Sequence, residues 1–340
     1  MDILKTFEER FLMQQEYLGN EKPVNKITPL VSVCVATYQH AGFISQCLES
    51  ILGQKTNFPV EIIVGEDGST DGTGQLCKNL AEKFQDRIRL FLRDRSLSQY
   101  YETGRTILRF NSKWNYMSAR GKYLAICEGD DYWTDPFKLQ KQVDFLEANP
   151  GYIMTYHDAK VIGTEGNVIA ESKIPDYQRK DYSEQEIIYG NIFISTQSLC
   201  FRNVISSFPE ELFKVINGDN FLFSLLGWHG RGKYMHDVEP AAYRVHPGGI
   251  WSMLTEQDKR ITSINTFYWL SVYYLRIGKS EAAMVYYNWM MERMDRLKAD
   301  IAMEINTRDP QKISLTQKTE AFLIRMIRAF FYFTRKVSRH

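Results

Sequence analysis

At residues 123–133 the chain reads Tyr123-Leu124-Ala125-Ile126-Cys127-Glu128-Gly129-Asp130-Asp131-Tyr132-Trp133, an apolar run followed at once by two adjacent carboxylates. The apolar run is typical of a buried strand in a parallel sheet. The carboxylates then lie at the carboxyl end of that strand, where open α/β sheets bind their ligands. Mg²⁺ and Mn²⁺ prefer oxygen ligands and often share them with substrate phosphates. The pair therefore predicts an anchor for a metal-bound diphosphate. An acidic turn before the helix start at Thr134-Asp135-Pro136 would have the same composition.

From residue 29 onward, apolar runs of strand length alternate with segments of helical periodicity. Strands separated by helices of this length imply a parallel sheet with right-handed crossovers. The expected strands are 31–36, 60–64, 88–92, 123–127 and 152–157, and the expected helices are 43–53, 71–84, 105–119 and 135–148. The pattern predicts an α/β fold with a mostly parallel central sheet flanked by helices.

The segments on both sides of this region are helical in pattern. Residues 1–28 place apolar groups at helical spacing, which predicts a short helix and a linker. Residues 253–340 show helical periodicity again, with helices expected at 261–276, 281–298 and 315–336. We therefore expect a main domain over 29–252 with a C-terminal helical region.

Composition narrows the class of protein. The 340 residues can form a full α/β core and an extra module, and 42 Lys and Arg against 41 Asp and Glu give no bulk charge for nucleic acid. The five cysteines are scattered without a CxxC pair, which indicates buried reduced thiols in a cytosolic protein. The first residues lack a signal-peptide pattern, and no run approaches the ~18–20 apolar residues of a membrane span. We expect a cytoplasmic protein.

Two further motifs follow strands, Ala36-Thr37-Tyr38-Gln39-His40 and Gly65-Glu66-Asp67-Gly68-Ser69-Thr70-Asp71-Gly72-Thr73. The Asp67 carboxylate can accept a hydrogen bond from a base or ribose, and Tyr38 on the neighbouring strand can stack on the base. An Asx-turn with a capped helix would explain the second motif without a ligand. The spacing differs from the GxGxxG and GxxxxGK[ST] patterns, which sets aside dehydrogenases and P-loop NTPases.

The segments Val31-Ser32-Val33-Cys34-Val35-Ala36-Thr37-Tyr38, Glu66-Asp67-Gly68-Ser69-Thr70-Asp71 and Glu128-Gly129-Asp130-Asp131-Tyr132-Trp133 together resemble the family 2 glycosyltransferases. The resemblance implies the GT-A fold and a nucleotide-diphosphate sugar as donor. It also implies a nucleotide-sugar-binding half over 29–135 and an acceptor half over 136–252.

The resemblance assigns residues of the donor site. Thr37, Tyr38 and Asp67 would hold the nucleoside. Asp130 and Asp131 stand at the family's DXD-type motif, with Asp131 as the more direct ligand of Mg²⁺ or Mn²⁺ and Asp130 beside the donor. Uracil is the base that the family implies, while Asp67 alone would also suit guanine or thymine.

Two later segments complete the predicted active site. Asn217-Gly218-Asp219-Asn220 resembles the place where inverting members present their catalytic base, so Asp219 would take the acceptor's proton; alternatively, Asp219 caps the following helix. Residues 243–252 resemble a loop that closes over the diphosphate, with His246 as a metal ligand and Arg244 as a phosphate contact, although an ordinary Pro-Gly-Gly turn has the same residues. The remaining histidines are expected to be structural or surface groups: His40, His157, His229, His236 and His340.

The implied reaction is an inverting, metal-assisted transfer of a sugar from a UDP-sugar to a glycan or lipid-linked acceptor in surface polysaccharide assembly. A non-catalytic module that binds nucleotide-sugars or glycans stays open. A sugar nucleotidyltransferase is disfavoured because residues 36–40 contain no Arg or Lys. The segment 315–336 interleaves aromatic and basic residues. It either packs on the protein or attaches it peripherally to the anionic inner face of the cell membrane.

Overall fold

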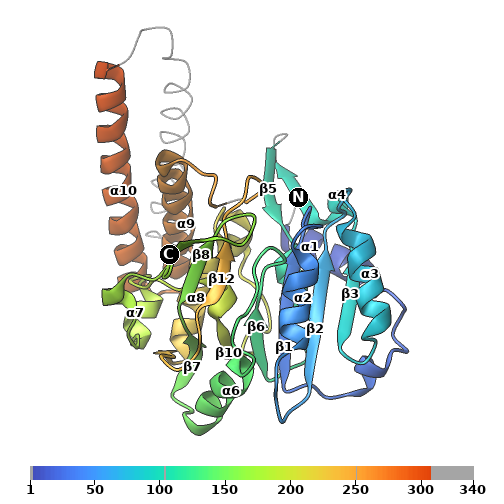
Figure 1. The fold of residues 1–340 in the computed structure, drawn as a ribbon. Helices are drawn as coiled ribbons and strands as arrows, with labels where there is room; N and C mark the ends of the chain where they lie inside the picture. The colour runs from blue at the N-terminus through green and yellow to red at the C-terminus, as the bar shows by residue number, and fades with distance from the viewer. Residues whose placement is uncertain (1–2, 103–104, 250, 308–340) are drawn as a thin grey trace. The chain divides into compact units, whose positions relative to one another are not determined.

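The computed structural model describes residues 3–102, 105–249 and 251–307, and the helix expected at 315–336 lies outside them. The chain divides into two compact units (Figure 1). The first unit comprises Met1–Phe213 with Leu222–Met253, and the second comprises Lys214–Phe221 with Leu254–His340.

A seven-stranded sheet forms the centre of the first unit, in the order β11-β7-β10-β6-β1-β2-β3 (Figure 1). Its strands are β1 (Val31–Thr37), β2 (Val60–Glu66), β3 (Ile88–Leu92), β6 (Tyr123–Ile126), β7 (Tyr152–Tyr156), β10 (Cys200–Arg202) and β11 (Arg231–Tyr234). β10 pairs antiparallel with β6 and β7, and the other neighbours pair parallel. The predicted α/β fold with a mostly parallel sheet is confirmed.

Alternating side chains of the strands build two apolar layers. Val31, Val33 and Val35 of β1 belong to the core cluster that includes α2, α3 and α6, whereas Cys34 belongs to the cluster on the other side. Successive side chains of a strand point to opposite faces, so a strand apolar at every position is covered on both. The helices of the first unit are α1 (Ile3–Met13), α2 (Ile44–Leu52), α3 (Thr73–Lys83), α4 (Arg95–Ser98), α5 (Asn111–Ser118), α6 (Lys138–Ala148) and α7 (Glu184–Ile188).

The helix expected at 105–119 is wrong over its first part. Residues Arg105–Arg109 form β5, which pairs antiparallel with β4 (Gln99–Glu102), and only α5 is helical. The β-branched pair Thr106 and Ile107 favours a strand, and a nearby partner strand lets this preference prevail over helical spacing. The segment from β4 to α5 therefore consists of two antiparallel strands followed by a short helix.

A small second sheet joins the central one at the acidic loop. It consists of β8 (Ala159–Ile162), β9 (Val168–Ala170) and β12 (Ala241–Arg244), with β12 parallel to β8 and β9 antiparallel to it. The backbones of Tyr132 and Ala242 form a reciprocal bridge, with N–H···O distances of 3.3 and 2.9 Å. This bridge brings the end of β12 beside the loop that follows β6.

The second unit contains the helix pair α9 (Glu256–Arg276) and α10 (Ser280–Thr307). Thr255 and Asp258 form a capping box at the start of α9, which explains why the helix begins before the predicted residue 261. Gly278, at φ 75°, lies in the turn between the helices. The two expected helices are confirmed, and their apolar contacts are made by Ile264, Tyr268, Val272, Met290, Met294 and Leu297. α8 (Gly218–Leu226) contributes residues to both units.

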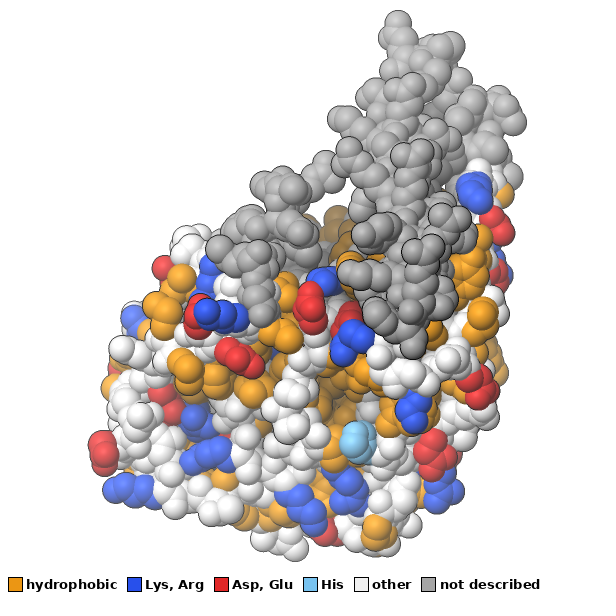
Figure 2. Space-filling model, turned by 180° about the vertical axis from the view of Figure 1, so that it is seen from behind, with side chains coloured by type: hydrophobic (Ala, Val, Ile, Leu, Met, Phe, Trp, Pro, Cys, Tyr) orange, Lys and Arg blue, Asp and Glu red, His pale blue; other side chains and the backbone are white. Residues whose placement is uncertain are grey.

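The state of the cysteines and the distribution of surface charge follow the expectations from composition. All five cysteines are free and buried, as predicted. On the face seen in Figure 2, the described basic and acidic side chains are interspersed with apolar ones and form no field of one sign. In the described part of the chain, no helix combines the length and apolar character that a bilayer crossing requires.

Candidate active site

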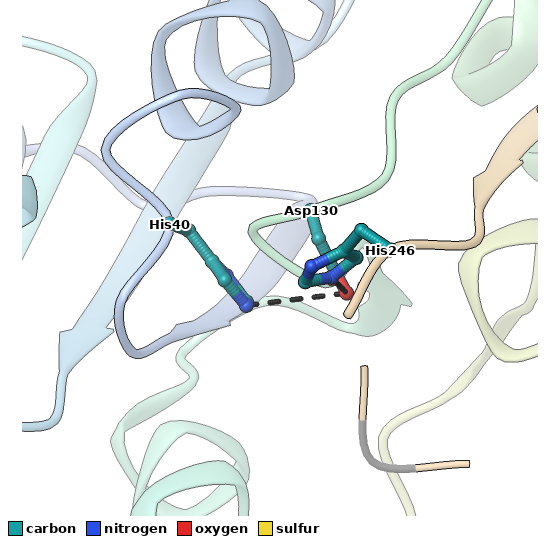
Figure 3. A group of neighbouring side chains, drawn as sticks. All are labelled: His40, Asp130 and His246. Carbon is teal, nitrogen blue, oxygen red and sulfur yellow. Dashed lines mark hydrogen bonds and ion pairs between the residues drawn. The ribbon is translucent and has the colours of Figure 1, made fainter. Parts of the chain in front are cut away.

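Three side chains from separate loops meet at the carboxyl edge of the central sheet (Figure 3). His40 follows β1, Asp130 follows β6 and His246 follows β12. Asp130 Oδ2 lies 3.1 Å from His246 Nε2 and 3.9 Å from His40 Nε2. One ligand atom from each residue falls within 4.8 Å of the others. We call these residues the metal cluster, because two imidazoles and a carboxylate at this spacing can bind one divalent cation.

The electrostatics of the metal cluster favour the forms that bind cations. Burial alone would raise the pKa of the Asp130 carboxyl, but the hydrogen bond with His246 and the neighbouring His40 outweigh it and lower that pKa. Burial also lowers the pKa of the His40 imidazole, against the opposing effect of Asp130. At neutral pH the cluster therefore offers a carboxylate and the neutral ring of His40, and metal binding requires these forms.

His40 departs from the expectation that it is a structural or surface group. Its sequence context contains no metal-ligand spacing, so residue patterns alone do not reveal it. The signal lies in the topology, because β1 and β6 are parallel neighbours and their carboxyl ends meet at one edge of the sheet. Any polar residue just after β1 is therefore a candidate to meet the acidic pair after β6.

Gly129 allows the two loops to approach one another. A Cβ atom at this position would lie 2.6 Å from Thr37 Oγ1 and 2.9 Å from His40 Nδ1, which is too close for any side chain. The backbone N–H of Gly129 donates to the carbonyl of Ala36 at 3.0 Å. A glycine between two acidic residues thus brings Asp130 against the loop of His40.

Asp131 lies outside the metal cluster and ties the acidic loop to β12. Its side chain is buried, and Oδ1 accepts the backbone N–H of Arg244 at 2.8 Å. Burial raises the pKa of its carboxyl, and the carboxylates of Asp130 and Glu128 raise it further. Of the acidic pair, the structure thus brings Asp130, which was predicted as the donor contact, rather than Asp131 to the two histidines. A direct role of Asp131 in metal binding stays a prediction.

Arg244 is buried, and its guanidinium is engaged by the protein. Nε donates to the carbonyl of Asp130 at 3.0 Å, and the terminal nitrogens donate to the carbonyl of Thr164 at 2.9 Å and to Gln46 Oε1 at 2.7 Å. The guanidinium also lies over the ring of Phe43, 4.7 Å from its centroid. These contacts hold the acidic loop, and the phosphate contact of Arg244 stays a prediction.

The three residues predicted to hold the nucleoside lie side by side at the ends of β1 and β2. The backbone N–H of Asp67 donates to the carbonyl of Thr37 at 3.0 Å, and Thr37 Oγ1 lies 3.2 Å from His40 Nδ1. The carboxylate of Asp67 is buried and accepts hydrogen bonds from Ser98 Oγ and from Arg95 at 2.7 Å. Thr37 therefore connects the metal cluster with the pair formed by Tyr38 and Asp67.

Gln39 fastens the loop of His40 to the loop after β2. It is one of two described non-glycine residues with positive φ, at 57°. Its side-chain oxygen accepts the backbone N–H groups of Thr70 at 2.9 Å and Asp71 at 3.2 Å, and its own N–H donates to Ser69 Oγ at 2.9 Å. Sparsely populated backbone conformations persist only where the surroundings hold them, and they concentrate at functional sites.

Asp219 belongs to the second unit and is described within that unit alone. It lies exposed in the first turn of α8, and its backbone N–H donates to Asn217 Oδ1 at 3.1 Å. The carboxamide of Asn217 thus caps this helix start, so Asp219 is not needed as the cap. The catalytic role of Asp219 stays a prediction.

Known proteins share this fold and sequence pattern. The family model described as Glycosyl transferase family 2 matches residues 32–101. An uncharacterized protein of Mycobacterium tuberculosis (strain H37Rv) is 32% identical over 231 residues, which cover 67% of this chain and 63% of that protein. An uncharacterized glycosyltransferase of Nostoc sp. (strain PCC 7120) is 24% identical over 222 residues, which cover 64% of this chain and 65% of the relative. This chain thus spans less than two thirds of the length of either relative.

A solved structure extends the likeness to nearly the whole chain. The mannosyltransferase PcManGT from Pyrobaculum calidifontis, in complex with GDP-Man and Mn²⁺, matches with a TM-score of 0.51 and 17% identity, over 99% of this chain and 93% of its own. At this identity the likeness concerns the fold, which is the GT-A fold. The fold class that these comparisons define is that of the GT-A glycosyltransferases, to which PcManGT is similar. Over residues 32–101 the chain matches glycosyltransferase family 2.

Proposed function

We propose that this protein transfers a sugar from a nucleotide-diphosphate sugar to an acceptor hydroxyl, with inversion at the anomeric carbon. The observation that carries the proposal is the metal cluster of His40, Asp130 and His246, joined through Thr37 to Tyr38 and Asp67. An aromatic ring and a carboxylate suit a base, and a cation site suits a diphosphate. One sheet edge thus offers partners for both ends of the nucleotide.

The donor set fits a divalent cation. His40, Asp130 and His246 would hold Mn²⁺ or Mg²⁺, and the two imidazoles favour Mn²⁺ because Mg²⁺ prefers oxygen ligands almost exclusively. When bound, the ion would supply positive charge to the leaving diphosphate. The Mn²⁺ in the complex of PcManGT supports this assignment. The chain itself keeps Asp130 ionised and holds its loop through Arg244.

We assign Tyr38 and Asp67 to the base and Thr37 to the nucleoside, with UDP as the carrier. Asp67 would accept the ring N3–H of the base, which uracil offers and cytosine lacks. Guanine offers an N–H as well, and PcManGT was solved with GDP-Man. GDP-sugars therefore belong in any test of the donor.

Asp219 is proposed as the base that takes the proton of the acceptor hydroxyl while that oxygen attacks the anomeric carbon. A single displacement would turn an α-linked donor into a β-linked product. We propose a glycan or lipid-linked acceptor in surface polysaccharide assembly, and a cytoplasmic protein attached to the membrane surface through residues 315–336.

The test is a panel of UDP- and GDP-sugars, each with Mn²⁺, with Mg²⁺ or with a chelator. We expect one donor to raise the melting temperature only when the cation is present, and its hydrolysis or transfer to release a nucleoside diphosphate. The anomeric configuration of the product, read by NMR, tests inversion. Metal-dependent binding without any turnover across an acceptor panel would favour a binding module, and a folded protein that binds no donor would contradict the proposal.

A further inference from the structure

The Arg95 guanidinium fills a small site between Tyr38 and Asp67. Its central carbon lies 3.3 Å from the centroid of the Tyr38 ring, which is contact over the ring face. One terminal nitrogen lies 2.7 Å from Asp67 Oδ2. The side chain of Asp67 is 3% exposed, whereas that of Arg95 is 25% exposed. An aromatic face and a buried carboxylate thus already bind a flat group with an in-plane N–H donor.

A nucleobase with a ring N–H has the same two features, a flat π-face and a donor in its plane. The guanidinium therefore marks the place and orientation that such a base would take. We infer that Arg95 occupies the base-binding site of the free protein and sets its affinity for the donor, because the base must displace the guanidinium from Tyr38 and Asp67. This inference rests on the proposed function, which assigns the same pair to the nucleoside.

The surroundings allow this exchange without loss of the site. Arg95 lies on α4, a helix of only four residues, and its side chain borders solvent, with 25% of its surface exposed. Asp67 stays in place when Arg95 leaves, because Ser98 Oγ donates to its other oxygen and its backbone N–H is bonded to Thr37. Asp67 Oδ2 can then accept a hydrogen bond from the base instead of from Arg95. Uracil, thymine and guanine offer a ring N–H there, whereas the corresponding ring nitrogen of cytosine and adenine is an acceptor and only their amino group donates.

The experiment measures the dissociation constants of UDP and GDP by calorimetry at saturating Mn²⁺, for the native chain and for Arg95→Ala. If the guanidinium competes with the base, Arg95→Ala binds the preferred nucleotide about fivefold more tightly, which corresponds to about 1 kcal/mol. Guanidinium chloride at millimolar concentration should compete with the nucleotide in Arg95→Ala, beyond the effect of sodium chloride at the same ionic strength. Arg95→Lys, which keeps the charge but loses the flat donor fork, should fall between the two.

A matched control is Lys78→Ala, which removes a cation 5.7 Å from the centroid of Tyr17, away from the site. It should leave both dissociation constants unchanged. Equal or weaker nucleotide binding by Arg95→Ala overturns the inference while the proposed function stands, because Arg95 would then be neutral or a direct contact of the base. Failure of the native chain and all three variants to bind either nucleotide overturns the proposed nucleoside site and the inference with it.

Discussion

Two carboxylates lie beside opposite ends of β1, in contrasting surroundings. At the amino end, Glu61 of β2 is fully buried, and its oxygens accept from Ser32 Oγ at 2.6 Å and from Arg120 at 2.6 Å, with Arg89 at 3.4 Å. At the carboxyl end, Asp130 faces the imidazoles of His246 and His40, at 3.1 and 3.9 Å. The carboxylate at the amino end is neutralised by permanently charged groups of the chain, whereas the one at the carboxyl end remains available to a cation. Burial of a charge therefore marks a site only where its neighbours can also act as ligands.

The largest effect is expected from Asp130→Asn. An amide loses the negative charge that the cation requires, so affinity for Mn²⁺ and sugar transfer should both fall by at least about 100-fold. Calorimetry with Mn²⁺ alone reads the first effect and release of nucleoside diphosphate reads the second. Asp144→Asn, at an exposed carboxylate of α6, is the control and should match the native chain. Native Mn²⁺ affinity in Asp130→Asn would remove Asp130 from the metal site.

The second prediction concerns Glu61, whose loss should lower stability without changing Mn²⁺ affinity. Glu61→Ala leaves Arg120 and Arg89 without their shared carboxylate and should lower the free energy of unfolding by about 3 kcal/mol. Mn²⁺ affinity of the folded fraction should stay native. Glu147→Ala breaks the exposed pair with Lys122, 2.8 Å apart, and should cost at most about 1 kcal/mol. If Glu61→Ala instead weakens Mn²⁺ binding at native stability, the distinction between the two ends fails.

The sequence predicts the amino-terminal half of the sheet better than the site at its edge. Strands such as 31–36 and 60–64 are predictable from the sequence. Their near-continuous apolar residues are typical of a parallel sheet that is buried on both faces. Periodicity does not indicate the strand at 105–109, because its pairing with β4 decides its structure. Local patterns do not reveal the role of His40, because its partners come from segments 90 and more than 200 residues away. Side-chain contacts that depend on how distant strands pair cannot be predicted from the residues on either side of one position.

Lys138 is a third buried ionisable group, and it lies outside the metal cluster. Burial lowers its pKa from 10.5 to about 8, and its ammonium meets only Gln142 at 2.6 Å and the face of Trp133. The unfolded chain therefore binds a proton between about pH 8 and 10.5 that the folded chain does not, so this group adds stability as pH rises through that window. Below it, the buried charge costs about 3 kcal/mol.

Lys138→Met should therefore raise the free energy of unfolding by about 1–2 kcal/mol at pH 7. This figure allows for the lost hydrogen bond to Gln142. The gain should shrink between pH 8 and 10, which urea unfolding of both proteins at each pH can measure. Mn²⁺ affinity should not change. A gain that is constant with pH would show that the charge of Lys138 is not its cause.

The smallest expected change in Mn²⁺ affinity comes from Gln39, in the loop that carries His40. Gln39→Ala removes the side-chain contacts to Thr70 and Asp71, so the loop of His40 should lose order and Mn²⁺ affinity should fall about fivefold, or about 1 kcal/mol. Gln39→Gly separates two causes, because glycine adopts positive φ freely but also lacks the amide. If the amide holds the loop, Gly and Ala weaken Mn²⁺ binding alike. If Gly binds as the native chain does, the backbone conformation alone places His40, and the amide contributes only to stability.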